Sequence, residues 1–391
     1  MTQHAREHRR TWPRAVGLGV VGILAFGAGG AAAVYLSLQS NIDEVDLTGL
    51  VGDERSRPSP TASAPGDSRA GSPVNLLIIG SDDRSGGNAA IGGENDGMNS
   101  DTTIVAHVAA DRSRVELVSI PRDLLADRPS CTMTDGSTTP ARANRQFNEA
   151  FAVGWNQGHD VRSASACTWK TVESLTGVRL DGLVLVDFVG LRDMVDAIGG
   201  VPMCLPTDLD DDVTGLHVKA GPQVFDGLTA TQFARARHNI GDGSDTGRIT
   251  RQHDLMAAMS RSVLSRDVLT DPGTMLRFAQ AATSSLAASS GFQSLTDLAG
   301  FGLSLRHLQA DRIVFASMPT AQARSDKDRV EATPAAAELW ARIAADQPVG
   351  EAPPAPVATT DAASPPPPPV ETPWSPPGGV LTSADGAAAC A

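Results

Sequence analysis

The sequence predicts an α/β protein, a three-layer α/β/α sandwich with a mixed central sheet, preceded by one transmembrane helix. Three observations support this prediction. Short apolar runs of strand length alternate with helical patterns, two of these runs are joined by a turn, and a long N-terminal run carries no charge. The 391 residues are enough for one large domain or two ordinary ones, and no internal repeat is evident.

The N-terminal apolar run spans residues 15–38 and is long enough to cross a bilayer as a helix. Arginines precede it and acidic residues follow it, so the positive-inside rule places residues 1–14 in the cytoplasm and the rest outside. A cleaved signal peptide is the alternative, because small residues end the run. Its length favours an uncleaved single-pass anchor in the cell membrane. Residues 39–72, rich in Ser, Pro, Asp and Gly, are then expected to form an extracytoplasmic linker.

The folded domain is expected to span residues 73–345. Residues 346–391 form a Pro/Ala-rich tail that cannot build a core and is expected to be disordered. The patterns predict strands at 74–79, 102–109, 115–120, 183–188 and 201–205, and helices near 145–154, 165–176, 191–198, 228–237, 246–265, 273–287 and 334–345. Ala-Asp-Arg-Ser separates the second and third strands, which indicates a hairpin.

Four cysteines in an exported chain favour disulfide formation. Cys131 and Cys167 flank one polar segment and are the favoured pair. Cys204 is either free or a competitor for that pairing, and Cys390, near the end of the tail, is expected to be unpaired. The cysteines and histidines lack zinc-site spacing, which argues against a thiolate metal site.

The composition excludes some classes of function. The net charge is −13 and aromatic residues make up 4% of the chain, so a broad nucleic-acid-binding surface is not expected. Neither a Gly-x-x-x-x-Gly-Lys-Ser/Thr phosphate loop nor a Gly-x-Ser-x-Gly nucleophile elbow occurs. The histidines are isolated, and Ser81 and Ser119 lack an evident base, so nucleophilic catalysis is a weak interpretation.

Two carboxylates are expected at one edge of the sheet. Asp82 follows the first strand, and Asp101 lies at the start of the second. If the first and third strands run the same way, Asp82, Asp101 and Arg122 meet at this edge, where α/β proteins commonly bind ligands. Mg²⁺ prefers one or two carboxylates together with phosphate oxygens. The alternative is that Asp82 and Asp83 cap a turn and Asp101 stabilises a loop.

Arginines are concentrated in one short segment of this acidic chain. Arg235 and Arg237 end one predicted helix, and Arg248, Arg251 and Gln252 lie in the first turns of the next. Guanidinium groups at a helix N-terminus favour an anion, because the helix dipole adds positive potential there. Arginine also matches phosphate with two parallel hydrogen bonds. The alternative is a solvated basic face that pairs with aspartates in the intervening loop.

Taken together, these motifs resemble those of the LytR–CpsA–Psr family over residues 73–265. The segments that carry the resemblance are Asn75-Leu-Leu-Ile-Ile-Gly-Ser-Asp-Asp-Arg84, Ser100-Asp-Thr-Thr-Ile104, Val118-Ser-Ile-Pro-Arg-Asp123, Phe147-Asn-Glu-Ala-Phe151, Asp196-Ala-Ile-Gly-Gly-Val-Pro202 and Arg235-Ala-Arg with Asp245-Thr-Gly-Arg-Ile-Thr-Arg-Gln252. The anchor, the linker and the Pro-rich tail also fit family members from high-GC Gram-positive bacteria.

The resemblance implies an extracytoplasmic phosphotransferase that moves a glycopolymer, or its linkage unit, from a polyprenyl pyrophosphate carrier to a peptidoglycan hydroxyl. Teichoic acid, teichuronic acid, arabinogalactan and capsule all remain open as the polymer. The family often has Arg where this chain has Asn99, which removes one cation from the site. By motif position, Asp82 and Asp101 hold Mg²⁺, with Mn²⁺ as an alternative, and the pyrophosphate is bound by Arg84, Arg122, Arg235, Arg237, Arg248 and Gln252.

The expected catalytic groups are Asp82, Asp101 and Arg122, and the proton acceptor is Asp82, Asp83 or Asp123. Apolar residues at 183–198 and 225–233 are candidates for a lipid groove and equally for the core. Two other functions remain open: a polyprenyl-pyrophosphate phosphatase or hydrolase, and a non-catalytic wall-binding or regulatory protein.

Overall fold

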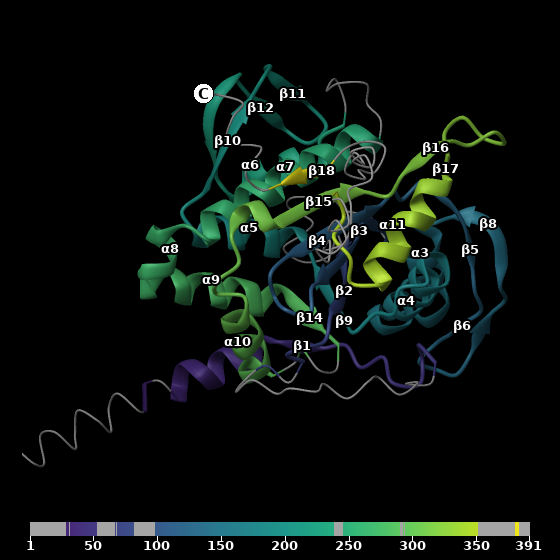
Figure 1. Cartoon of the computed structure of the whole chain (residues 1–391), viewed down its shortest axis with the longest axis horizontal. Coiled ribbons are helices and arrows are strands. Elements are labelled where there is room, and N and C mark those ends of the chain that lie inside the picture. Colours follow the sequence, from purple (N-terminus) through teal and green to yellow (C-terminus); the bar gives the residue numbers. More distant parts are fainter. Residues whose placement is uncertain are drawn as a thin grey trace, which may run out of the picture.

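The computed structural model describes residues 29–30, 32–52, 67, 69–81, 98–237, 245–289, 292, 294–350 and 380–382. Their centre is an eight-stranded sheet in the order β1-β14-β9-β2-β3-β4-β15-β18 (Figure 1). Parallel and antiparallel neighbours both occur, so the sheet is mixed, as predicted. The strands are β1 (Asp43–Glu44), β2 (Val74–Ser81), β3 (Ser100–Val108), β4 (Val115–Ile120), β9 (Gly182–Val186), β14 (Leu286–Ala288), β15 (Ile313–Ser317) and β18 (Val380–Thr382).

Helices cover both faces of this sheet, which confirms the α/β fold (Figure 1). One side carries α3 (Glu149–Gly158), α4 (Val161–Thr176) and α11 (Pro334–Ala344). The other side carries α5 (Phe188–Ala197), α6 (Gly227–Arg235), α7 (Asp245–Val263) and α9 (Pro272–Ser285). The short α8 (Arg266–Thr270) lies between α7 and α9, and α10 (Leu295–Ser304) and a 3₁₀ helix (Ala310–Arg312) follow α9.

Successive side chains of a strand face opposite sides of the sheet, so one face of the sheet packs into the core and the other faces the site. Leu77 and Ile79 of β2 are fully buried in the main core, together with Phe151 of α3. Ile78 lies between them in sequence and therefore faces the opposite side of the sheet. There it lines a cavity together with Ile104 of β3.

The other strands pair in small two-stranded sheets outside the central sheet: β5 (Leu125–Arg128) with β8 (Arg142–Gln146), β6 (Cys131–Thr132) with β7 (Thr138–Thr139), β10 (Val201–Leu205) with β13 (Gly221–Phe225), β11 (Leu209–Asp211) with β12 (Leu216–Val218), and β16 (Thr320–Gln322) with β17 (Val330–Ala332). The start of the helix predicted at 145–154 is wrong, because the chain up to Gln146 pairs with β5. The helix begins at Glu149 instead.

The linker predicted at 39–72 needs a correction, because its described residues are part of the folded domain. Val45, Leu47 and Leu50 are buried in the same core as β2. The short β1 pairs with β14 in parallel. These apolar side chains recur every two or three residues, and their burial favours packing over an extended spacer.

The tail predicted from residue 346 also begins too early. The Asp346 carboxylate accepts hydrogen bonds from Arg114 at 2.6 Å and from the backbone N–H of Ala110 at 3.1 Å. Val349 is buried, and its N–H donates to Glu116 at 2.6 Å. Farther along, β18 extends the sheet by pairing with β15. The domain therefore includes chain beyond residue 345.

The favoured disulfide is confirmed, since Cys131 is bonded to Cys167. It ties β6 to α4 across the polar segment that both cysteines flank. Cys204 is disulfide-bonded as well, so the alternative that it is a free thiol is wrong. Cys390 lies outside the described residues.

Most of the segment predicted to cross the membrane, residues 15–28, lies outside the described part of the chain. Among the helices that the structure does describe, none has the length and apolarity that crossing a bilayer requires.

Candidate active site

The predicted hairpin brings the first two site residues together. β3 and β4 are antiparallel and β2 runs parallel to β4, so the end of β4 lies beside the start of β3. Arg122, just beyond β4, donates from Nη1 to Asp101 Oδ1 at 2.9 Å. The strand directions inferred from sequence are therefore confirmed, as is the proximity of these two side chains.

Two arginines from the helical side reach the same carboxylate. Arg248 of α7 donates from Nη2 to the Asp101 carbonyl oxygen at 2.7 Å, and its Nη1 lies 3.6 Å from Asp101 Oδ1. Arg237, two residues beyond α6, places Nη2 at 4.0 Å from the same oxygen. Arg248 is almost completely buried, with 3% of its surface exposed. Three guanidinium groups from three segments thus converge on one carboxylate.

This convergence keeps Asp101 ionised. Burial alone would raise its pKa, but the attraction of Arg248 and Arg122 outweighs burial and holds the pKa below its ordinary value. A carboxylate held in its charged form has hard oxygen donors of the kind that Mg²⁺ prefers.

The remaining predicted residues of this cluster have different contacts. The Arg235 guanidinium lies over the Phe188 ring, 4.6 Å from its centroid. Gln252 lines the cavity, but its amide donates to the Ala234 carbonyl at 3.2 Å. Arg251 donates to the carbonyl of Ala236. Gln252 and Arg251 therefore bind carbonyl groups at the C-terminal end of α6, just before Arg237.

An apolar cavity of about 560 Å³ opens beside these charges. Arg122, Arg237 and Arg248 lie in its wall together with Asp101. Apolar side chains from the sheet, α5 and α7 supply much of the remaining lining: Ile78, Ile104, Val186, Phe188, Leu191, Met194, Leu255, Met256 and Met259. A charged region that adjoins an apolar chamber suits a ligand with an anionic head and an apolar tail.

The two segments proposed for a lipid groove behave differently. Val186, Leu191 and other residues of 183–198 line the cavity. In 225–233, Phe225 and Phe233 instead contact each other edge-on, with ring centroids 5.3 Å apart, in a buried cluster that also contains Leu255 of the cavity wall. Sequence reasoning missed the three apolar cavity residues of α7, Leu255, Met256 and Met259, because apolar residues at helical spacing look the same in a core and in a cavity wall.

Several predicted residues lie outside the described part of the chain, namely Asp82, Asp83, Arg84 and His238. Asn99 is described and lines the cavity, so the position at which the family often has Arg belongs to the site. Asn148, from the segment Phe147-Asn-Glu-Ala-Phe151, also lines the cavity, and its N–H donates to the Arg122 carbonyl at 3.2 Å.

Asp123 was one candidate proton acceptor. Its Oδ1 accepts from Gln146 at 2.6 Å and from Arg329 at 3.2 Å. Its Oδ2 lies 3.5 Å from Nε of Arg122. This carboxylate therefore forms an ion pair with Arg122 and already accepts hydrogen bonds from two other side chains.

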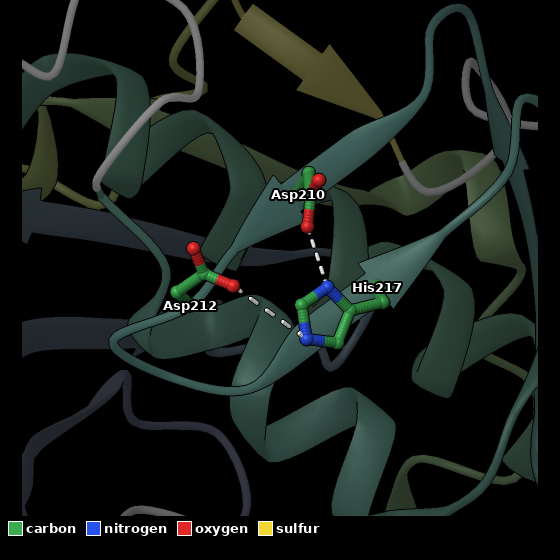
Figure 2. A group of neighbouring side chains, drawn as sticks. All are labelled: Asp210, Asp212 and His217. Atoms are coloured by element: carbon green, nitrogen blue, oxygen red, sulfur yellow. Dashed lines mark hydrogen bonds and ion pairs between the residues drawn. The ribbon is translucent and has the colours of Figure 1, made fainter.

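One further group of acidic and histidine side chains lies on the hairpin of β11 and β12. Figure 2 shows His217 between Asp210 and Asp212, with ring nitrogens 2.5 Å and 4.0 Å from the two carboxylates. All three side chains are largely exposed. The hydrogen bond between His217 and Asp210 accounts for the closeness of these exposed side chains, and we assign them no metal.

Comparisons with known proteins identify the family of this chain. The LytR_cpsA_psr family model matches residues 35–342. The cell wall biosynthesis protein LcpA of Corynebacterium glutamicum is 28% identical over 304 residues, which are 74% of this chain and 58% of the relative. This chain thus spans little more than half of that protein.

The polyisoprenyl-teichoic acid–peptidoglycan teichoic acid transferase TagU of Bacillus mycoides is 30% identical over 260 residues, covering 66% of this chain and 74% of TagU. Among solved structures, TagV of B. subtilis has a TM-score of 0.52 at 20% identity, covering 70% of this chain and 96% of TagV. This structural likeness supports the fold.

Proposed function

Because the chain belongs to the LytR–CpsA–Psr family, we propose that it is an extracytoplasmic phosphotransferase that attaches a glycopolymer, or its linkage unit, to peptidoglycan through a phosphodiester. The donor is the glycan on a polyprenyl pyrophosphate carrier. The TagU relative is named for a transfer of this kind. The observation that carries the proposal is the apolar cavity beside three arginines that share the Asp101 carboxylate.

Each part of the site has a role in this reaction. The cavity holds the polyprenyl tail, and Arg122, Arg237 and Arg248 bind the pyrophosphate. The acceptor hydroxyl oxygen forms a bond to the glycan-linked phosphorus, and the bond from that phosphorus to the bridging oxygen breaks. Polyprenyl phosphate leaves with the added negative charge, which the arginines stabilise. Arg235 is expected at the same head group.

The proton of the acceptor hydroxyl goes to a carboxylate, and Asp82 is the proposed acceptor. Asp123 is the weaker candidate because Gln146 and Arg329 already occupy it. Asp82 and Asp101 together are proposed to hold Mg²⁺ or Mn²⁺, which suits the ionised state of Asp101. The metal would supply further neutralisation of phosphate charge.

The anchor belongs to the same proposal. Residues 15–38 are proposed to cross the membrane once, with residues 1–14 in the cytoplasm and the domain outside. A lipid-linked donor in the outer leaflet is then accessible to the domain.

Transfer can be measured with the full chain in detergent, a polyprenyl-pyrophosphate-linked glycan, peptidoglycan oligomers and Mg²⁺. We expect glycan attached to peptidoglycan, and loss of the product in Asp101→Asn and Arg122→Lys. Arg145→Lys is the matched control, because Arg145 lies on β8, is half-exposed and pairs with Glu149. Release of free glycosyl phosphate without attachment would identify a hydrolase. Binding without turnover, unchanged in Asp101→Asn, would exclude both enzymatic functions.

A further inference from the structure

Asp211, the last residue of β11, is a fully buried carboxylate between two parts of the cavity wall. Its Oδ1 accepts the N–H of Val213 at 2.9 Å and the N–H of Thr214 at 3.3 Å. Its Oδ2 accepts the backbone N–H of Arg237 at 2.8 Å. A buried carboxylate is costly unless hydrogen bonds satisfy it, and each oxygen here accepts at least one backbone N–H.

The two oxygens of this carboxylate contact different parts of the site. Val213 and Thr214 form the turn between β11 and β12, and both line the cavity. Arg237 lies on the other side, with its guanidinium at Asp101. Asp211 therefore connects the wall of the apolar chamber directly to a residue of the charged region.

The backbone at the end of α6 explains why Arg237 depends on this contact. The Ala236 N–H donates to Gln232, and Ala236 then adopts φ −58° and ψ 135°, which ends the helix. The next N–H, that of Arg237, points away from the helical ladder and donates to Asp211. The carboxylate thereby fixes the chain direction at the residue from which the guanidinium projects.

We infer that Asp211 is a positioning residue that holds Arg237 and the cavity turn as one unit, so that the pyrophosphate and the first part of the lipid tail are bound in a fixed relation. This inference rests on the proposed function. No neutral isostere can preserve both connections. An asparagine has one acceptor oxygen, so its NH₂ group must oppose the N–H groups of the turn or the N–H of Arg237.

The chain offers matched controls on either side. Asp210 and Asp212 are the sequence neighbours of Asp211, but their side chains are 77% and 89% exposed and face His217 (Figure 2). Replacing Asp210 with Asn changes the same charge on the same hairpin without touching Arg237.

The test measures binding of geranylgeranyl pyrophosphate to the full chain in detergent by titration calorimetry, with Mg²⁺ present. We expect Asp211→Asn to weaken binding about tenfold, the size of one charge-assisted hydrogen bond. Asp210→Asn should stay within about twofold of the parent. In an Arg237→Ala background, Asp211→Asn should have less than about a twofold effect, because its main target is gone.

The outcomes separate the inference from the function on which it rests. If the parent chain does not bind the probe, the proposed function fails and the inference fails with it. If the parent binds but Asp211→Asn equals Asp210→Asn, the inference alone is overturned. An equal loss with and without Arg237 would show that Asp211 only supports the fold, which also overturns the inference. Thermal melting of every variant accompanies the titrations.

Discussion

The free energy of unfolding of the parent and that of the His253→Gln variant should differ by an amount that depends strongly on pH. His253 of α7 is buried, and its Nε2 lies 2.8 Å from the Ser119 hydroxyl of β4. Burial lowers its pKa from 6.5 to about 4. The folded state thus binds this proton less tightly than the unfolded state, so the stabilisation is complete above about pH 6.5 and is lost as the pH falls towards 4.

The magnitude follows from the size of that shift. Each unit of pKa corresponds to about 1.4 kcal/mol, so the parent loses roughly 3 kcal/mol across this window through His253. Glutamine keeps an acceptor near Ser119 but does not titrate. The free energy of unfolding of the parent minus that of His253→Gln should therefore fall by roughly 3 kcal/mol between pH 7.5 and pH 4.

Urea unfolding of both chains in detergent, followed by tryptophan fluorescence at several pH values, measures this difference. Other titrating groups cancel in the subtraction. A difference for His253→Gln that is constant from pH 7.5 to 4 would refute the reasoning.

Three further predictions use other parts of the molecule. Burial raises the pKa of Glu116 from 4.5 to about 7, so its contribution to stability is present below pH 4.5 and is lost as the pH rises through 7. The free energy of unfolding of Glu116→Gln minus that of the parent should therefore increase over this pH range in the same urea assay. Replacing both Cys131 and Cys167 with Ala frees a loop of 36 residues and should lower the free energy of unfolding by about 4 kcal/mol, which chemical denaturation measures. Arg248→Lys loses the planar fork that reaches Asp101 and should reduce kcat/KM for glycan transfer about 100-fold, with an unchanged melting temperature as its control.

Local patterns predicted much of this fold because they reflect burial directly. The continuous apolar run of β2 and the β3–β4 hairpin could be read from the sequence, and together they predicted that Asp101 and Arg122 meet. The short strands β1 and β18 could not be predicted, since two or three residues carry no measurable periodicity. Their positions depend on pairing with distant partners.

The site shows the same division between local and long-range information. The arginine cluster was evident from composition, but the use of Gln252 was not, because its partner is a backbone carbonyl on another helix. Asp211 carried no sequence signal, because two exposed aspartates flank it and nothing distinguishes it from them except burial. Burial at a single polar position depends on the assembled fold.

The combination of features restricts the ligand more than any one of them. A soluble phosphate would be bound by the arginines around Asp101 but has no use for a chamber lined by Ile78, Leu191 and the α7 methionines. A neutral lipid would fill that chamber but gains nothing from guanidinium groups, which are costly to desolvate. Asp211 accepts N–H groups from both regions, and with their spacing fixed in this way the proposed ligand carries its anion immediately next to its apolar chain. A polyprenyl pyrophosphate meets both conditions.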